Sequence, residues 1–91
     1  MVIMIKYGLY NEIEKRKMSF ADAGDTVVLI QNGIFWTIRE AYKKYVKEGV
    51  KVVALKEDYL ARGYDEKDSP VPLISYDELI EIFEKDHKTA G

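Results

Sequence analysis

Apolar residues occur along the chain in short uninterrupted runs, separated by longer segments that mix apolar and charged positions. The runs lie at residues 2–5, 27–30, 50–55 and 73–74 and consist largely of valine, isoleucine and leucine. Runs of this length, without alternation between apolar and polar residues, are typical of strands buried on both faces of a sheet. The pattern therefore predicts four strands.

The segments after these runs carry helical patterns over residues 11–23, 34–48 and 57–62, and a last pattern covers residues 75–83. In the second segment, a period of about 100° per residue puts several apolar side chains on one face. They are Ile34, Phe35, Ile38, Ala41, Tyr42, Tyr45 and Val46. In the last segment, Ser75 and Glu78 have the spacing of a capping box. Its predicted apolar stripe consists of Tyr76, Leu79, Ile80, Ile82 and Phe83.

The alternation of strands and helices predicts an α/β domain with right-handed βαβ connections and a mostly parallel four-stranded sheet. Pro70 and Pro72 cannot donate ladder hydrogen bonds, so the fourth strand is expected at an edge of the sheet. Residues 87–91 have no apolar periodicity and are expected to form a mobile tail. The length of 91 residues indicates one domain covering residues 1–91.

Composition narrows the possible functions. The 14 Lys and Arg against 16 Asp and Glu give a net charge of −2, which argues against direct nucleic-acid binding. No apolar run approaches the roughly 20 residues of a membrane span, and no targeting segment is seen, so the cytoplasm is expected. A chain this short buries a modest core, and a homo-oligomer would supply further burial. The charged fraction of 33% without cysteine is compatible with a thermophilic source.

Catalytic chemistry has few candidate residues in this chain. It contains no cysteine, and the only histidine, His87, falls in the expected tail. Nucleophilic catalysis needs an activated nucleophile beside a base, and zinc sites use mainly Cys and His ligands. No GxGxxG or GxxxxGK[ST] phosphate motif occurs. We therefore expect neither an enzyme nor a bound metal or cofactor.

Polar residues after two predicted strands are candidates for a ligand site, because open parallel sheets bind ligands beyond the carboxyl ends of their strands. Glu57 and Asp58 follow the third strand and are candidate acid/base groups or cation ligands. Alternatively, both complement the dipole of the helix that they begin. Asn32 and Gly33 precede the second helix, where backbone amides can hold an anion. The alternative is that Asn32 caps this helix and Gly33 eases the turn.

Trp36 stands apart from the apolar face of the second predicted helix. It lies about 200° around that helix from Ile34, among charged side chains such as Lys43. Tryptophan is enriched in interface hot spots, so Trp36 is a candidate interface residue, and Tyr59 is a candidate to join the same surface. The alternative is that a neighbouring loop of the same chain covers Trp36.

Three stretches together resemble the DsrH/TusB family of sulfur-relay subunits. Residues 24–35 read GDTVVLIQNGIF, residues 53–63 read VALKEDYLARG and residues 74–80 read ISYDELI. They are similar, in order and spacing, to the family's GD-x-VLLI-x-(D/N)-GVY, YALKEDLxARG and SYDEFV segments. The region of resemblance runs from about residue 24 to residue 83, which is most of the chain.

The resemblance implies a small Rossmann-like or flavodoxin-like three-layer domain. It implies assembly with DsrE/TusD-like and DsrF/TusC-like proteins, and a role in persulfide transfer, either toward 2-thiolation of the tRNA wobble uridine or in sulfur oxidation. Two features depart from the family pattern. Residues 10–23 contain no cysteine, and the chain ends in Thr-Ala-Gly instead of a tryptophan. Since persulfide chemistry needs a thiolate, no sulfur-carrying residue can be assigned here.

Two functions from different classes remain open at this point. The chain is either a non-catalytic subunit of a sulfur relay or a stand-alone homo-oligomeric binding module that has diverged from that family. The three motifs and the missing thiol favour the relay subunit. The departures from the family pattern and the position of Trp36 favour the binding module.

Overall fold

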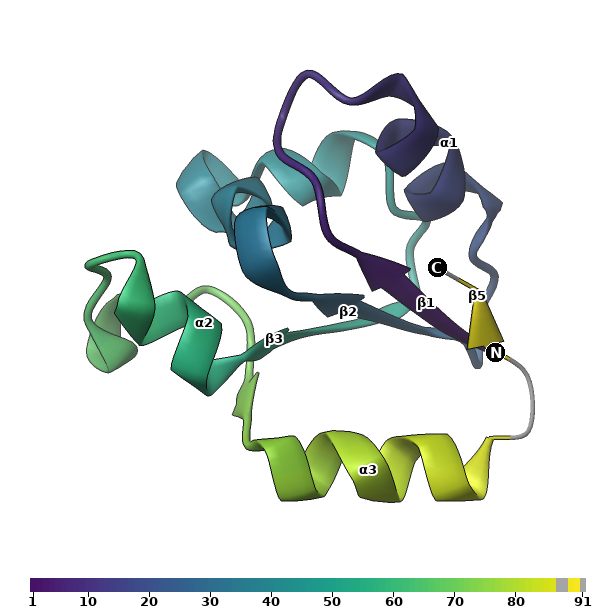
Figure 1. Cartoon of the computed structure of the whole chain (residues 1–91). Coiled ribbons are helices and arrows are strands. Elements are labelled where there is room, and N and C mark those ends of the chain that lie inside the picture. The colour runs from purple at the N-terminus through teal and green to yellow at the C-terminus, as the bar shows by residue number, and fades with distance from the viewer. Residues whose placement is uncertain (87–88, 91) are drawn as a thin grey trace.

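A parallel sheet of five strands forms the centre of the part of the chain that the structure describes (Figure 1). The computed structural model describes residues 1–86, 89 and 90. The strands are β1 (Val2–Ile5), β2 (Thr26–Leu29), β3 (Lys51–Leu55), β4 (Leu73–Ile74) and β5 (Thr89–Ala90). Their order is β4-β3-β2-β1-β5, and every neighbouring pair is parallel. The predicted strands, their parallel arrangement and the edge position of β4 are therefore confirmed.

The fifth strand comes from the segment for which the sequence predicts a mobile tail. Thr89 and Ala90 pair in parallel with Val2 and Ile3 of β1. The expectation is therefore wrong for these two residues, because their backbone forms part of the sheet. Residues 87, 88 and 91, among them His87, lie outside the described part of the chain.

Helices cover both faces of the sheet and give the three layers that the family resemblance implies (Figure 1). On one face lie α1 (Glu12–Phe20) and η1 (Gln31–Lys44), and on the other lies α3 (Tyr76–Lys85). The short helices α2 (Lys56–Ala61) and η2 (Glu66–Asp68) follow β3. No helix among the described residues is long and apolar enough to cross a membrane.

Successive residues of each strand point to opposite faces of the sheet, where they join two separate apolar clusters. Ile3, Val27 and Val52 belong to the cluster under α1 and η1, together with Met18 and Trp36. On the other face, Val2, Val28 and Val53 pack with residues of β4 and α3, including Ile74 and Leu79. Burial on both faces explains why the strands read as uninterrupted apolar runs.

The order of the strands reverses next to β1. Strands β1 to β4 are added in one direction across the sheet, and β5 then lies on the other side of β1. In open parallel sheets, ligands bind beyond the carboxyl ends of the strands at such a reversal. The loop that follows β1 is therefore the position that the topology singles out.

The last helix forms largely from local signals. The Ser75 hydroxyl accepts a hydrogen bond from the Glu78 amide at 3.2 Å, and the Glu78 carboxylate accepts one from the Ser75 amide at 3.1 Å. The predicted capping box is thus confirmed. Leu79 is buried, but Tyr76 and Ile80 are more than half exposed, so their predicted place in the apolar stripe is wrong.

The connection between β2 and β3 is not the continuous helix predicted over residues 34–48. It is a 3₁₀ segment with a kink, in which Ile38, Arg39 and Glu40 leave helical geometry. Arg39 and Glu40 have φ angles of 50° and 52°, a left-handed conformation that is unfavourable for residues with a Cβ. The prediction was wrong because it assumed 3.6 residues per turn. A 3₁₀ helix has three residues per turn, so Trp36 lies on the same face as Gly33.

Candidate functional site

The segments beyond the carboxyl ends of β2 and β3 contain all four residues predicted for a ligand site. Asn32 and Gly33 lie at the start of η1, while Glu57 and Asp58 lie in the first turn of α2. The structure brings Asn32 and Asp58 together through the backbone amide of Gln31, which precedes Asn32, and through Arg62, which was not among the predicted residues. Glu57 is exposed on α2 and is not part of this contact.

The contact between the two loops is made by side-chain acceptors and nearby donors. An Asp58 carboxylate oxygen accepts a hydrogen bond from the Gln31 amide at 2.7 Å. The Asn32 side-chain oxygen accepts hydrogen bonds from Nε and Nη2 of Arg62 at 3.3 and 3.2 Å. Arg62 also donates to the Asp58 carbonyl at 3.3 Å. These bonds fix the start of η1 against α2 and use the groups that were candidates for ligand binding.

Asn32 does not cap the second helix, because the N-cap of η1 is Ile30 and no side-chain capping bond forms there. Gln31 has a φ of 49°, and the Asp58 carboxylate holds its amide in this unusual conformation. Among the described residues, no group of three or more His, Cys, Asp or Glu side chains is placed to hold a metal ion.

Gly33 is required by the close approach of two backbones. A Cβ built on Gly33 would lie 1.9 Å from the Ile5 carbonyl oxygen. The Gly33 amide donates to the Lys6 carbonyl at 3.1 Å and to the Ile30 carbonyl at 2.8 Å. The role of Gly33 here is thus to let η1 begin against the end of β1.

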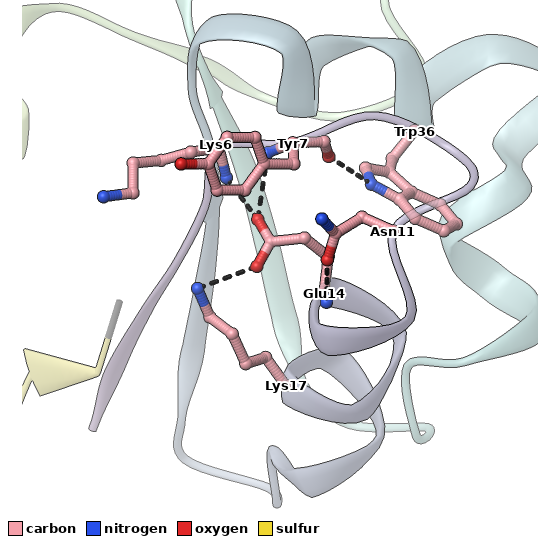
Figure 2. Close-up of polar contacts among 6 residues, drawn as sticks. All are labelled: Lys6, Tyr7, Asn11, Glu14, Lys17 and Trp36. Atoms are coloured by element: carbon pink, nitrogen blue, oxygen red, sulfur yellow. Dashed lines mark hydrogen bonds and ion pairs between the residues drawn. The ribbon is translucent and has the colours of Figure 1, made fainter.

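A buried carboxylate fixes the loop between β1 and α1 (Figure 2). Glu14 is 1% exposed, and its Oε2 accepts hydrogen bonds from the Lys6 amide at 2.6 Å and the Tyr7 amide at 3.0 Å. Its Oε1 pairs with the Lys17 ammonium at 2.9 Å. The Asn11 side chain caps the helix by accepting from the Glu14 amide at 3.0 Å. Since a buried charge needs such partners, Glu14 ties this loop firmly to α1.

Trp36 lies in the core and is 1% exposed, so its predicted position on a charged surface is wrong. Its indole N–H donates to the Tyr7 carbonyl at 2.9 Å (Figure 2). Its ring packs edge-on against Tyr45, with the ring centroids 5.5 Å apart. The alternative, in which a neighbouring loop covers Trp36, describes this arrangement. The indole therefore holds the β1–α1 loop in place together with Glu14.

Tyr59 also lies inside the molecule, at 2% exposure, and its ring stacks on Tyr64 at 5.1 Å. Burial raises the pKa of the Tyr59 hydroxyl. Neither Trp36 nor Tyr59 is thus available on the surface of the described chain. The burial of Trp36 depends on Tyr7, which is 29 residues earlier in the chain, so no local pattern indicates it.

The arrangement beyond the strands is a rigid set of loops whose charged groups are largely paired within the chain. Glu14, Asp58 and Arg62 each bind neighbouring loops and hold them in place. The chain has no thiol that could carry sulfur. At this end of the sheet, the carboxylates of Glu14 and Asp58 are engaged by backbone amides of neighbouring loops.

Comparisons with known proteins agree with this fold. The family model described as "DsrH like protein" matches residues 10–89. A solution structure of protein Tm0979 from Thermotoga maritima is 46% identical, with 97% of each chain covered and a TM-score of 0.75. A second solution structure, of TM0979 described as a "putative sulfur transferase", is 39% identical over 100% of each chain, with a TM-score of 0.67. A comparison with curated proteins gave no significant match.

Proposed function

The chain belongs to the family of DsrH-like proteins, and on this basis we propose that it is a non-catalytic subunit of a sulfur relay. In this role it assembles in the cytoplasm with DsrE/TusD-like and DsrF/TusC-like proteins. The sulfur that passes through the assembly is carried by cysteines of these partners. The acceptor that we propose is the pathway to 2-thiolation of the tRNA wobble uridine.

The observation that carries this proposal is family membership combined with a cysteine count of 0. In persulfide transfer, an acceptor thiolate attacks the outer sulfur of a donor persulfide and releases the donor thiolate. A chain without a thiol can take neither part in this exchange. Its contribution is then to hold or position the subunits that do.

Exposed apolar side chains support the assembly. Ile13 is 67% exposed and Phe20 64%, and both lie on α1. Tyr76 and Ile80 on α3 are 54% and 53% exposed. Large apolar side chains on both outer layers are typical of surfaces that contact other proteins. With a net charge of −2, contacts to tRNA are expected to fall to the partners.

The experiment that tests the proposal uses the chain with the DsrE-like and DsrF-like proteins of its own organism. Light scattering should give the mass of a mixed complex. With a ³⁵S persulfide on the DsrE-like protein, the label should reach the acceptor protein faster when this chain is present, and no label should remain on this chain. Separate masses, together with an unchanged transfer rate, would contradict the proposal.

Two surface variants serve as controls in this experiment. Phe20→Glu on α1 and Ile80→Glu on α3 each place a charge on one of the two exposed apolar surfaces. If the complex forms as proposed, at least one of these variants should lose it while keeping the circular dichroism spectrum of the folded chain. The affected variant should also lose the acceleration of sulfur transfer.

The alternative function is a homo-oligomeric binding module without relay partners. The absence of cysteine from residues 10–23 favours it, because many members of the resembled family carry a thiol in this region. The same light-scattering measurement separates the two functions. A homo-oligomer that keeps its mass when the relay proteins are added would support the binding module.

A further inference from the structure

A hollow of about 560 Å³ lies between the loop after β1 and the start of η1. Its walls are formed by Tyr7, Gly8, Leu9, Tyr10, Asn11, Phe35 and Ile38. The volume falls within the range of about 300–1,000 Å³ that is usual for small-molecule sites. The hollow also lies beyond the carboxyl ends of β1 and β2, the end of an open parallel sheet where ligands bind.

The walls are mainly aromatic and apolar, and a few hydrogen-bond donors lie among them. Tyr7 and Tyr10 are 57% and 94% exposed, so their ring surfaces are open to a ligand. The Asn11 side-chain oxygen is used in capping α1, which leaves the N–H₂ group on the same side chain without a partner among the described residues. A planar ring bearing an acceptor oxygen matches these walls, since rings stack on aromatic faces and the amide can donate to the oxygen.

The backbone amides next to the hollow are not free to bind anions. Backbone amides after the first strand bind phosphate groups in many α/β folds. Here the amides of Lys6 and Tyr7 already donate to the buried carboxylate of Glu14, which is itself paired with Lys17. A phosphorylated ligand would therefore find these two donors occupied.

The loop that forms the hollow is held in place before any ligand binds. The Tyr7 carbonyl accepts from the Trp36 indole, and the Lys6 carbonyl accepts from the Gly33 amide. Such preorganisation lowers the entropic cost of binding. A small site of this kind differs from a protein interface, which buries roughly 800 Å² on each partner.

We propose that this hollow binds a small, uncharged aromatic molecule that carries a hydrogen-bond acceptor, and that phosphorylated ligands bind it less tightly because Glu14 occupies the amides of Lys6 and Tyr7. The ring stacks against the tyrosines and Phe35, and the acceptor receives a hydrogen bond from Asn11. This binding is independent of the relay function, because no thiol and no partner protein takes part in it.

The test is a titration of the ¹⁵N-labelled full chain, followed by amide chemical shifts. Benzamide supplies an uncharged ring with an acceptor oxygen, and phenyl phosphate supplies a ring of the same size with a charge. Benzamide should give saturable shifts at millimolar concentration, centred on the amides of Gly8, Asn11 and Phe35. Phenyl phosphate should bind at least about tenfold more weakly, as expected for the loss of one hydrogen-bonded or charge-compatible contact.

Two exposed tyrosines provide a matched pair of variants. Tyr10→Ala removes a ring from the wall and should weaken benzamide binding roughly three- to tenfold, the usual contribution of an aromatic contact. Tyr76→Ala removes an exposed ring from α3, on the opposite face of the sheet, and should leave binding unchanged. Neither side chain is buried, so both variants are expected to fold.

Three results would overturn the proposal. The first is the absence of saturable shifts, and the second is a set of shifts centred away from the hollow, for example around Ile13 and Phe20. The third is equal weakening of binding by both tyrosine variants. If a phenylalanine-containing peptide binds more tightly than benzamide and its shifts extend along α1, the hollow is part of a peptide-docking surface and the small-molecule proposal is wrong.

Discussion

The helices η1 and α3 lie on opposite faces of the same sheet, yet they are stabilised in different ways (Figure 1). The helix α3 has a complete capping box and regular α-helical geometry over Tyr76–Lys85. In contrast, η1 has no side-chain cap, contains a kink and includes residues with left-handed φ angles. Its position depends on contacts with β1, the β1–α1 loop and α2. A helix can thus be formed by its own sequence or by its surroundings, and mutations should distinguish the two cases.

The largest effect is expected where η1 meets β1. Gly33→Ala would place a methyl group 1.9 Å from the Ile5 carbonyl oxygen, so the two backbones must separate. We expect the free energy of unfolding to fall by more than about 3 kcal/mol, since the strain falls on backbone that cannot repack. Urea denaturation measures this. Gly8→Ala is the control, because the nearest atoms lie at 3.8 Å and little change is expected.

The next effect concerns the buried carboxylate that fixes the β1–α1 loop. Glu14→Ala leaves the amides of Lys6 and Tyr7 without an acceptor and the Lys17 ammonium without its partner. A loss of about 2–3 kcal/mol is expected, because unpaired buried donors are costly. Glu12→Ala removes a carboxylate that is 73% exposed and paired with Lys15, and should cost less than about 0.5 kcal/mol. Similar losses in both variants would show that Glu14 does not fix the loop.

On the other face, Ser75→Ala tests the local stabilisation of α3. The variant loses the hydrogen bond from the Glu78 amide to the Ser75 hydroxyl. A loss of about 1 kcal/mol is expected from removing an N-cap side chain. The first turn of α3 should fray, and amide hydrogen exchange there should become faster. If exchange in η1 accelerates as much as in α3, the two helices are less independent than the comparison indicates.

The smallest effect, with opposite signs in the two helices, is expected from glycine substitutions. Arg39→Gly removes a Cβ from a residue with a φ of 50°, and should raise the free energy of unfolding by up to about 1 kcal/mol. Glu81→Gly on the exposed side of α3 should instead lower it by about 1 kcal/mol. Thermal unfolding of both variants gives the comparison. If Arg39→Gly lowers the free energy of unfolding, the left-handed conformation of Arg39 at the kink is not strained.

The features that could be predicted from the sequence divide in the same way. The strands and the capping box of α3 were predicted correctly, because each depends on residues close together in the chain. The parallel sheet was predicted from the alternation of strands and helices, although its paired strands lie far apart in the chain. The position of Trp36 was wrong, because its burial depends on a hydrogen bond to Tyr7, 29 residues earlier in the chain. The roles of Glu14 and Arg62 were not found, since nothing in a local pattern distinguishes a buried charged residue from an exposed one.

In the candidate site, too, contacts between distant segments could not be predicted from the sequence. The sequence placed Asn32 and Asp58 beyond the ends of strands, where the structure also has them. It could not show that Arg62 binds Asn32 or that Asp58 accepts from the Gln31 amide, because these pairs lie 30 and 27 residues apart. Nor could it reveal the hollow beside β1, whose walls come from two separate loops.

The amino-acid sequence alone was enough to predict the α/β class, to show that no thiol can carry sulfur and to identify the motifs of the DsrH-like family. These follow from residue types and short spacings, which act through local hydrogen bonds and the burial of apolar runs. Only the tertiary structure decided where η1 bends, why Trp36 is buried and which amides Glu14 occupies. These depend on the packing of distant segments, where a close backbone approach or a buried charge outweighs the helical preference of the chain.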